Sequence, residues 1–191
     1  MPEDSSRRQF LQLTGSAFSG TWLASHWPAL LAVAQSACVA RDKGLGFSHL
    51  APELAADIAA IAAQIIPTDD TPGATEAGVI YFIDGALDTI MKGAGGMLAK
   101  GVNELNARLT QHYGSKRFSQ LDTEAQLAVL RDEEQSALFG TVRFLTVAGM
   151  FAMPQHGANK DRVGWDLLGF DSRHGWQPPF GHYDAEETSG D

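Results

Sequence analysis

Two adjacent carboxylates, Asp69 and Asp70, have side chains suited to chemistry. A carboxylate pair can act in general acid–base catalysis or bind Ca²⁺. A calcium loop, however, alternates more oxygen donors than the stretch Thr68-Asp69-Asp70-Thr71-Pro72-Gly73 supplies. Aspartates in such a stretch commonly accept hydrogen bonds from nearby backbone N–H groups and so form the turn. We therefore predict that Asp69 and Asp70 shape a turn or belong to a loop that faces a partner.

Histidines and aspartates near the C-terminus form the second set of candidates. The set consists of His156, His174, His182, Asp161, Asp166, Asp171 and Asp184. None of these histidines has the short spacing that puts two metal ligands on one helix face, as in H-E-x-x-H. The chain also has no G-x-S-x-G nucleophile motif, and Gly93-Ala94-Gly95-Gly96 follows no strand as a nucleotide-binding loop would. We predict no catalytic, metal-binding or cofactor-binding residue in this chain, and a flexible connection at Gly93–Gly96.

A pair of arginines near the N-terminus belongs to an export signal. Arg7 and Arg8 precede Phe10 and Leu11, which begin a weakly apolar stretch. Ala32-Val33-Ala34 then offers a small-x-small cleavage pattern. This order is typical of a twin-arginine signal, which a receptor reads before exporting an already folded protein. We predict a signal peptide over residues 1–34, the twin-arginine (Tat) translocase as a partner, and a periplasmic location.

The apolar stretch is too polar for a convincing membrane span, which needs about 20 predominantly apolar residues. An uncleaved signal that acts as an anchor, or an indirect association with the membrane, stays open. Cys38 is the single cysteine, which excludes an internal disulfide, a Cys-ligated iron–sulfur cluster and a C-x-x-C-H haem site in this chain. Lipidation of Cys38 is an alternative, although Gln35 stands where a lipidation motif has an aliphatic residue.

The balance of charge bears on the class of partner. The chain has 14 Lys and Arg against 23 Asp and Glu, a net charge of −9, and its basic residues form no cluster beyond Lys116-Arg117. An acidic protein without a basic patch is not expected to bind nucleic acid.

Removal of residues 1–34 from the 191-residue chain leaves 157 residues, enough for one domain. We predict a linker over residues 35–49, a helical domain over residues 50–186 and a tail over residues 187–191. Apolar residues at helical spacing predict helices over residues 52–66, 75–91, 97–113, from Asp122 or Thr123 onward, and 136–153. The expected inward faces are Leu54, Ile58, Ile61, Ala62 and Ile65; Val79, Ile83, Ala86, Leu87 and Ile90; Leu98, Val102, Leu105 and Leu109; Leu127 and Leu130; and Leu138, Val142, Leu145, Ala148 and Gly149. No alternating strand pattern occurs, so the fold class is all-α with about five helices.

From Pro154 onward the helical spacing ends and a long, irregular segment rich in aromatic residues, glycine and proline begins. Its aromatic residues are Trp165, Phe170, Trp176, Phe180 and Tyr183. Aromatic side chains supply large contact areas, so this segment is expected either to wrap around its own helices or to lie across another protein.

Two blocks of the chain resemble the gluconate 2-dehydrogenase subunit 3 family. The first block is Ile65-Ile66-Pro67-Thr68-Asp69-Asp70-Thr71-Pro72-Gly73-Ala74, followed by Glu76-Ala77-Gly78-Val79 and Phe82-Ile83-Asp84. The second is Leu145-Thr146-Val147-Ala148-Gly149-Met150-Phe151, then Gly157-Ala158-Asn159, Gly164-Trp165-Asp166-Leu167-Leu168-Gly169-Phe170 and Pro178-Pro179-Phe180-Gly181. The resemblance extends over about residues 50–186.

The resemblance implies a non-catalytic small subunit of a periplasmic dehydrogenase complex. Members of this family accompany a large FAD-dependent flavoprotein of the glucose–methanol–choline (GMC) type that oxidises a sugar or sugar acid, and often a cytochrome c subunit with haem c. The small subunit carries the twin-arginine signal for the pair. The residues expected to face the partner are Asp69, Asp70, Trp165, Phe170, Trp176, Pro178, Pro179 and Phe180. The alternative is an independent periplasmic enzyme or metal-binding protein that uses the C-terminal His and Asp residues.

Overall fold

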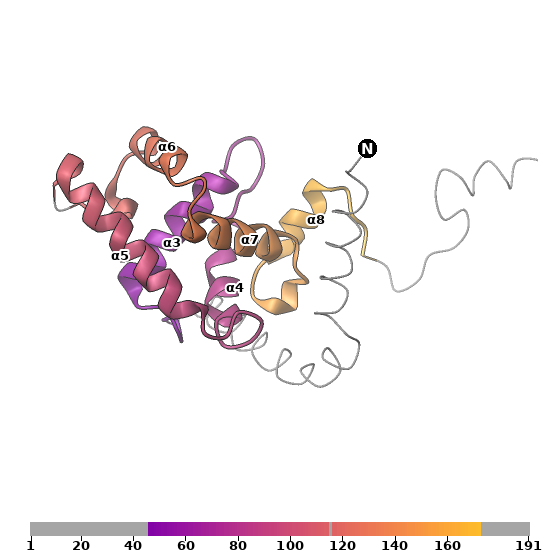
Figure 1. Cartoon of the computed structure of the whole chain (residues 1–191). Helices are drawn as coiled ribbons and strands as arrows, with labels where there is room; N and C mark the ends of the chain where they lie inside the picture. Colours follow the sequence, from indigo (N-terminus) through magenta and orange to yellow (C-terminus); the bar gives the residue numbers. More distant parts are fainter. Residues whose placement is uncertain (1–45, 115, 173–191) are drawn as a thin grey trace, which may run out of the picture.

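The computed structural model of the chain describes residues 46–114 and 116–172 (Figure 1). This part consists of six α-helices and three 3₁₀ helices, and it contains no strand. The α-helices are α3 (Pro52–Ile65), α4 (Val79–Ala86), α5 (Ala94–Tyr113), α6 (Thr123–Asp132), α7 (Ala137–Phe151) and α8 (Val163–Leu167). The 3₁₀ helices are η1 (Phe118–Gln120), η2 (Pro154–His156) and η3 (Lys160–Arg162). The all-α fold class is confirmed.

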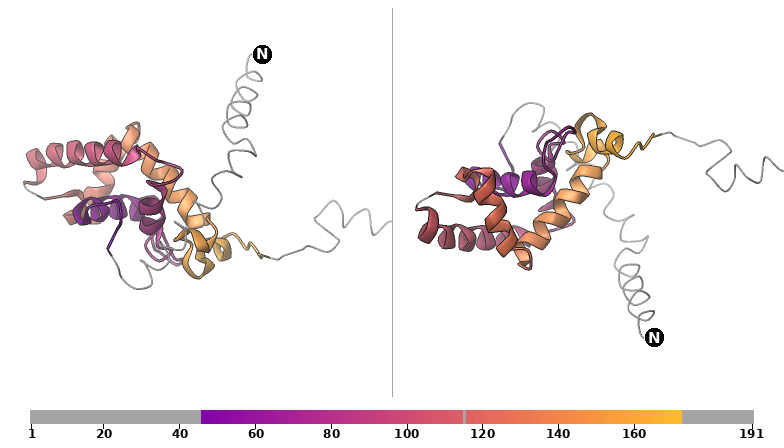
Figure 2. Two further views of the ribbon diagram at one scale, coloured as in Figure 1. Left: turned by 90° about the horizontal axis from the view of Figure 1, so that it is seen from below. Right: turned by 90° about the horizontal axis from the view of Figure 1, so that it is seen from above.

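Helices α3 and α7 form the centre of the domain. α3 packs against α4, α5, α6, α7 and η1, and α7 packs against α3, α4, α5 and α8. In Figures 1 and 2, α6 and α8 lie at opposite ends of this arrangement, with α7 between them. The short helix α8 at one end and α6 at the other are therefore joined through the central pair α3 and α7.

Most helix ends follow local rules. The Asp122 side chain accepts a hydrogen bond from the Ala125 N–H at 2.9 Å, and Ser136 accepts one from the Phe139 N–H at 3.1 Å. Both residues are N-caps, and of the two residues Asp122 and Thr123 between which the sequence left the start of the fourth helix open, Asp122 is the cap. Pro67 follows the end of α3, and α5 ends at Gly114, where φ is 68°.

The predicted second helix, residues 75–91, is wrong at both ends. α4 covers only Val79–Ala86, and its N-cap is Gly78 with φ of 70°, not Thr75, where the predicted helix begins. The prediction of a flexible connection at Gly93–Gly96 is also wrong, because α5 already begins at Ala94 and includes the two following glycines. Gly93 is the N-cap of α5 with φ of 93°, a conformation that glycine adopts at little cost.

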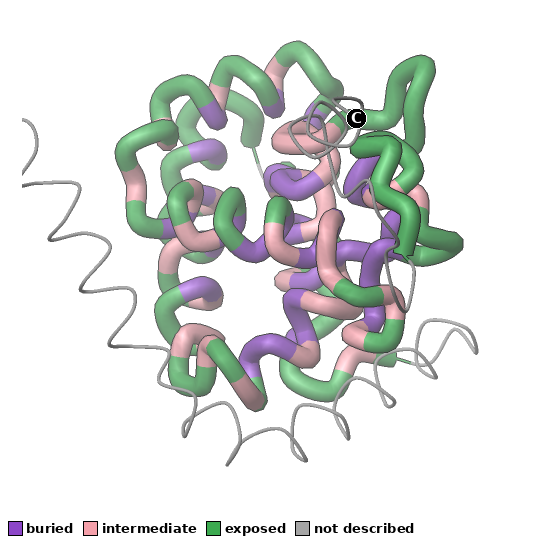
Figure 3. Tube along the Cα trace, turned by 90° about the vertical axis from the view of Figure 1, so that its right-hand side faces the viewer, coloured by how far each residue is buried: buried purple, intermediate pink, exposed green. Residues whose placement is uncertain are grey.

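The core lies where the helices face one another, and the outer turns are exposed (Figure 3). Nearly all of the predicted inward residues are buried or partly buried. Two are exceptions: Leu127 is 38% exposed on α6, and Ile90 is 39% exposed in the turn region after α4. Ile90 was expected to continue a helical face, and α4 ends before it.

A helix that spans a membrane needs about 20 predominantly apolar residues. Among the described residues, no helix combines the length and apolar composition needed to cross a bilayer.

Candidate partner-binding site

The loop between α3 and α4 contains the predicted carboxylate pair. Asp69 accepts hydrogen bonds at 2.9 Å from both the backbone N–H and the hydroxyl of Thr71, so it forms the expected turn. These bonds lower the pKa of the Asp69 carboxyl. Asp70 is exposed beside it. The two carboxylates therefore lie on a surface turn. Among the described residues, the hydrogen bonds that form this turn involve the Asp69 side chain and not that of Asp70.

Glu76 closes the same loop from its far end. Its carboxylate accepts a hydrogen bond from the Thr68 hydroxyl at 2.6 Å and another from the Gly73 N–H at 2.9 Å. The bond from Thr68, followed by backbone hydrogen bonds, lowers the pKa of Glu76. A Cβ atom on Gly73 would lie 2.5 Å from the Ile66 carbonyl oxygen, so only glycine fits here. The loop is thus held in one shape by its own side chains.

Asp84 on α4 binds the segment that leads into the domain. Its two carboxylate oxygens accept hydrogen bonds from the backbone N–H groups of Ser48, His49 and Leu50 at 2.8, 2.8 and 2.9 Å. The Leu50 side chain is buried, and the Phe47 ring lies 5.4 Å from that of Tyr81. The chain therefore enters the domain at a fixed point on α4.

Asn159 organises the segment after α7, although it was predicted only as part of a motif. Its buried side chain donates a hydrogen bond to the Ala152 carbonyl at 2.9 Å and accepts one from the Gly164 N–H at 2.8 Å. The Lys160 N–H also binds the Ala77 carbonyl at 3.1 Å, which ties the segment to the turn before α4. Two parts of the chain that the sequence presented as separate motifs are thus in contact.

Trp165 and Phe170, both predicted to face a partner, are brought together by α8 and the turn that follows it. Their rings meet edge to face with centroids 5.3 Å apart. Trp165 is half-buried, and its indole N–H donates to the Phe151 carbonyl at 3.1 Å. Phe170 is 50% exposed. Trp165 therefore attaches this segment to α7, whereas Phe170 presents apolar surface to the outside.

The helix α8 itself was not predicted, because it is only five residues long and too short for a periodic pattern. The rest of the segment from Pro154 to Phe170 consists of turns and 3₁₀ helices, in agreement with the irregular character that the composition indicates.

A buried carboxylate on α3, Asp57, was missed. Asp57 is fully buried and accepts hydrogen bonds from Asn106 at 2.8 Å and from both the N–H and hydroxyl of Ser119 at 3.0 and 2.7 Å. Arg117 donates from Nε at 3.0 Å and from Nη2 at 2.6 Å. Burial raises the pKa of the Asp57 carboxyl, but these hydrogen bonds outweigh it and hold that pKa below its usual value.

The signal that could have revealed Asp57 is its position in the helix. It stands three residues after Leu54 and four before Ile61, on the apolar face of α3. A carboxylate on such a face needs donors from elsewhere in the fold, because an unpaired buried charge is costly. Here the donors come from α5 and from the turn at η1.

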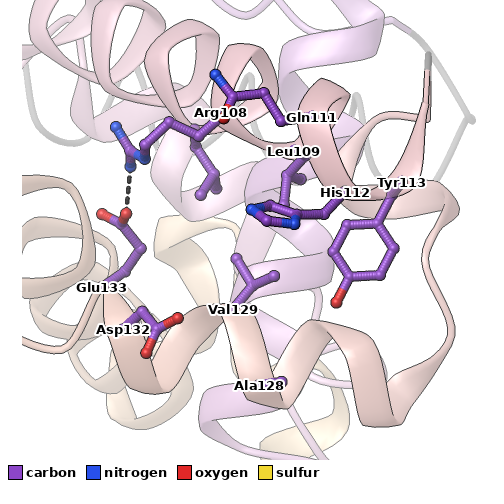
Figure 4. A pocket seen from close by; sticks show the side chains of 10 residues that line it. Arg108, Leu109, Gln111, His112, Tyr113, Ala128, Val129, Asp132 and Glu133 are labelled. Carbon is purple, nitrogen blue, oxygen red and sulfur yellow. Dashed lines mark hydrogen bonds and ion pairs between the residues drawn. The ribbon is translucent and has the colours of Figure 1, made fainter.

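A cavity of about 430 Å³ lies between α5 and α6 (Figure 4). Leu105, Leu109 and Val129 supply its apolar lining, and Arg108 forms an ion pair with Glu133 across it. The volume is in the range of small-molecule sites. The charges of Arg108 and Glu133 neutralise each other, so this pair leaves no free charge to orient a ligand.

The described C-terminal candidates are His156, Asp161, Asp166 and Asp171. His156 is half-buried in η2, and burial lowers its pKa. Within residues 46–114 and 116–172, no group of three or more His, Cys, Asp or Glu side chains is placed to hold a metal ion. His174, His182 and Asp184 lie outside the described residues.

Several other predicted residues also lie outside the described part of the chain. They are Arg7, Arg8, Phe10 and Leu11 of the export signal, Cys38, and Trp176, Pro178, Pro179 and Phe180 of the C-terminal segment.

The described domain matches a known protein family. A family model described as Gluconate 2-dehydrogenase subunit 3 matches residues 52–171. This range contains the loop of Asp69, the Asp84 anchor, the Asp57 cluster and the segment around Asn159 and Trp165. No curated protein and no solved structure matches the chain.

Proposed function

Because the chain belongs to the gluconate 2-dehydrogenase subunit 3 family, we propose that it is the non-catalytic small subunit of a periplasmic dehydrogenase complex. The observation that carries this proposal is the family match, which extends from the first residue of α3 to beyond α8. The catalytic partner would be a large FAD-dependent subunit of the GMC type that oxidises a sugar or sugar acid. A cytochrome c subunit with haem c would then receive the electrons.

The role that we propose for this chain is to carry and stabilise its partner. The small subunit binds the folded, flavin-loaded large subunit, and the twin-arginine signal on residues 1–34 exports both through the Tat translocase. A partner that binds only the folded state also raises that state's stability, by RT ln(1 + [L]/Kd) for one site. Complex formation in the cytoplasm therefore serves export and folding together.

The Asp84 anchor supports such a role. Three backbone hydrogen bonds attach residues 48–50 to α4, so the segment that precedes the domain leaves from one place on the folded surface. Residues 48–50 are thereby part of the folded cargo that the twin-arginine pathway would export.

Of the residues proposed to contact the partner, those that the structure describes form two groups. One is the turn with Asp69 and Asp70, and the other is the segment with Trp165 and Phe170. Trp176, Pro178, Pro179 and Phe180 would extend the second part. These residues are contacts, and catalysis is assigned to the large subunit.

The decisive experiment changes the arginine pair in the native host. The double variant Arg7→Lys, Arg8→Lys should leave the small subunit, the flavoprotein and the sugar-oxidising activity in the cytoplasmic fraction. The matched control Arg41→Lys changes an arginine outside the motif and should leave all three in the periplasmic fraction. Periplasmic flavoprotein in the double variant would disprove the carrier role.

Purification of the chain by itself tests the rival function, an independent enzyme with C-terminal His and Asp residues. We expect neither turnover of sugars or sugar acids nor stoichiometric metal. Turnover by the isolated chain would replace the subunit proposal with the enzyme.

A further inference from the structure

A pocket of about 360 Å³ lies at the junction of α3, α6 and α7, and it is separate from the cavity between α5 and α6. The end of α3, the second half of α6 and the first turns of α7 supply most of its lining. α3 packs against both of the other helices, which fixes the walls of the pocket relative to one another. The volume is in the range of small-molecule sites, so the pocket is large enough for a small organic molecule.

One side of this pocket is apolar. It is lined by Ile65 of α3, by Leu127 and Leu130 of α6 and by Phe139 of α7. The sequence predicts both leucines as inward residues, yet only Leu130 is buried, and Leu127 is 38% exposed. Because Leu127 lines the pocket, part of its apolar surface stays open to a ligand.

The pocket also contains positive charge that the described residues do not pair. Arg131 of α6 and Arg143 of α7 both line it, and neither side chain makes a hydrogen bond or ion pair within the described part of the chain. Glu134 lines the same pocket without an ion pair to either arginine. In the cavity between α5 and α6, by contrast, Arg108 is paired with Glu133. Two arginines against one glutamate leave this pocket positive, in a chain with a net charge of −9.

Hydrogen bonds hold the pocket wall at the contact between α3 and α6. Gln64, which lines the pocket, donates from Nε2 to Gln126 Oε1 at 2.7 Å. The buried Gln126 in turn donates from its own Nε2 to the carbonyl oxygens of Phe118 and Leu121, both at 3.1 Å. These bonds form without a ligand, so the wall is already in place and binding would order little of the protein.

We infer that this pocket binds a small amphipathic anion, with a carboxylate at the two arginines and a hydrocarbon chain along the apolar side. A guanidinium group fits a carboxylate through two parallel hydrogen bonds, which a neutral ligand cannot accept in the same way. The hydrocarbon chain gains free energy by removing apolar surface, including that of Leu127, from water. A medium-chain fatty acid combines these two parts.

This site is distinct from the residues proposed to contact the large subunit. None of Asp69, Asp70, Trp165 and Phe170 lines the pocket. The inference therefore adds a ligand to the role proposed above and does not depend on it.

The test titrates the full-length chain with decanoate in isothermal titration calorimetry. The double variant Arg131→Gln, Arg143→Gln removes both positive charges from the pocket. The matched control Lys92→Gln, Arg162→Gln removes two exposed positive charges that do not line it. All four side chains are exposed, so circular dichroism and thermal unfolding of both variants should match wild type.

We expect one decanoate to bind per chain in wild type and control, and the arginine variant to bind about tenfold or more weakly, because its charge-assisted hydrogen bonds are lost. Decanol has the same hydrocarbon chain without the charge, and acetate has the carboxylate without the chain, so both should bind more weakly than decanoate by a similar factor. An arginine variant or decanol that equals wild type with decanoate would overturn anion recognition. Equal binding of acetate would overturn the amphipathic class, and no binding by wild type would overturn the site.

Methyl NMR spectra of the full-length chain locate the bound probe. Decanoate should shift the methyl resonances of Ile65, Leu127 and Leu130, while those of Leu105 and Leu109 in the cavity between α5 and α6 stay unchanged. The variant Leu127→Gln changes an exposed side chain and should weaken decanoate binding severalfold with the fold intact. Shifts confined to other methyl groups of the chain would place the probe elsewhere and overturn the inference.

Discussion

Asp57 Oδ2 and Arg117 Nη2 lie 2.6 Å apart, although 60 residues separate them in the chain. Asp57 is completely buried, while the Arg117 side chain is 34% exposed. The carboxylate also binds Asn106 of α5 and Ser119 of η1, so one side chain of α3 joins three elements. This cluster is a polar connection between α3, α5 and η1.

Asp57→Asn should lower the free energy of unfolding by about 3 kcal/mol at neutral pH, because loss of one partner leaves the other charge uncompensated. The expected loss lies at the lower end of values for buried pairs, since Arg117 still reaches solvent. Urea unfolding followed by circular dichroism measures it. Asp88→Asn, an exposed aspartate near the end of α4, is the control and should stay within about 0.5 kcal/mol of wild type. An Asp57→Asn variant that is as stable as wild type would refute the structural role assigned to Asp57.

The same cluster predicts how stability depends on pH. In the folded state the pKa of Asp57 lies below its ordinary value of 3.8. The contribution of its carboxylate to the free energy of unfolding is therefore fully present above about pH 4, and it is lost as the pH falls through the folded-state pKa. The difference in unfolding free energy between wild type and Asp57→Asn should be constant from about pH 5 to 8 and shrink below about pH 4. Denaturant unfolding across this range is the measurement. A difference that grows at low pH would have the wrong sign.

Asp84→Asn should release the entry segment without unfolding the helices. The carboxylate accepts three N–H groups, whereas an amide retains one acceptor oxygen and adds donors. Charge-assisted hydrogen bonds contribute about 1.5–3 kcal/mol each, so exchange of the Ser48, His49 and Leu50 amides should accelerate by about tenfold or more. Hydrogen-exchange mass spectrometry detects this, with Asp88→Asn as control. Unchanged protection of residues 48–50 would show that the anchor lies elsewhere.

Substitution by alanine is expected to have opposite effects on stability at two glycines. At Gly164 a new Cβ would meet the Met150 carbonyl oxygen at 2.0 Å, so Gly164→Ala should displace α8 and destabilise by about 1–3 kcal/mol. At Gly140, within α7, a Cβ meets nothing within 4 Å, so Gly140→Ala should stabilise by about 0.5–1 kcal/mol. Thermal unfolding measures both. An unchanged or raised melting temperature of Gly164→Ala would contradict the close packing of α8 on α7, and a lowered one for Gly140→Ala would contradict the open space at that position.

Local sequence rules predicted most of the helices. The inward faces of α5 and α7 follow from apolar spacing, and Asp122 and Ser136 cap the helices that follow them. The second helix failed because Glu76 binds Thr68 and Gly73 and holds the preceding residues in a turn. A glutamate is compatible both with a loop and with an exposed helix, so the sequence did not distinguish the two.

Only part of the candidate site could be predicted from the sequence. The turn at Asp69 followed from its neighbours, since the acceptor and its donors are two residues apart. The role of Asn159 did not, because its partners depend on how α8 returns to the end of α7. Trp165 and Phe170 were predicted to contact a partner, and only the structure shows that Trp165 is attached to α7 while Phe170 is exposed.

The sequence by itself determined the all-α class, the main helices and the family resemblance, because these depend on residue types repeated over short distances. The tertiary structure alone decided which polar residues are structural. Asp57 and Asp84 bind groups 34 to 62 residues away, and no local pattern encodes such pairings. Burial then makes these pairings necessary, because a carboxylate removed from water requires donors that only the assembled helices supply.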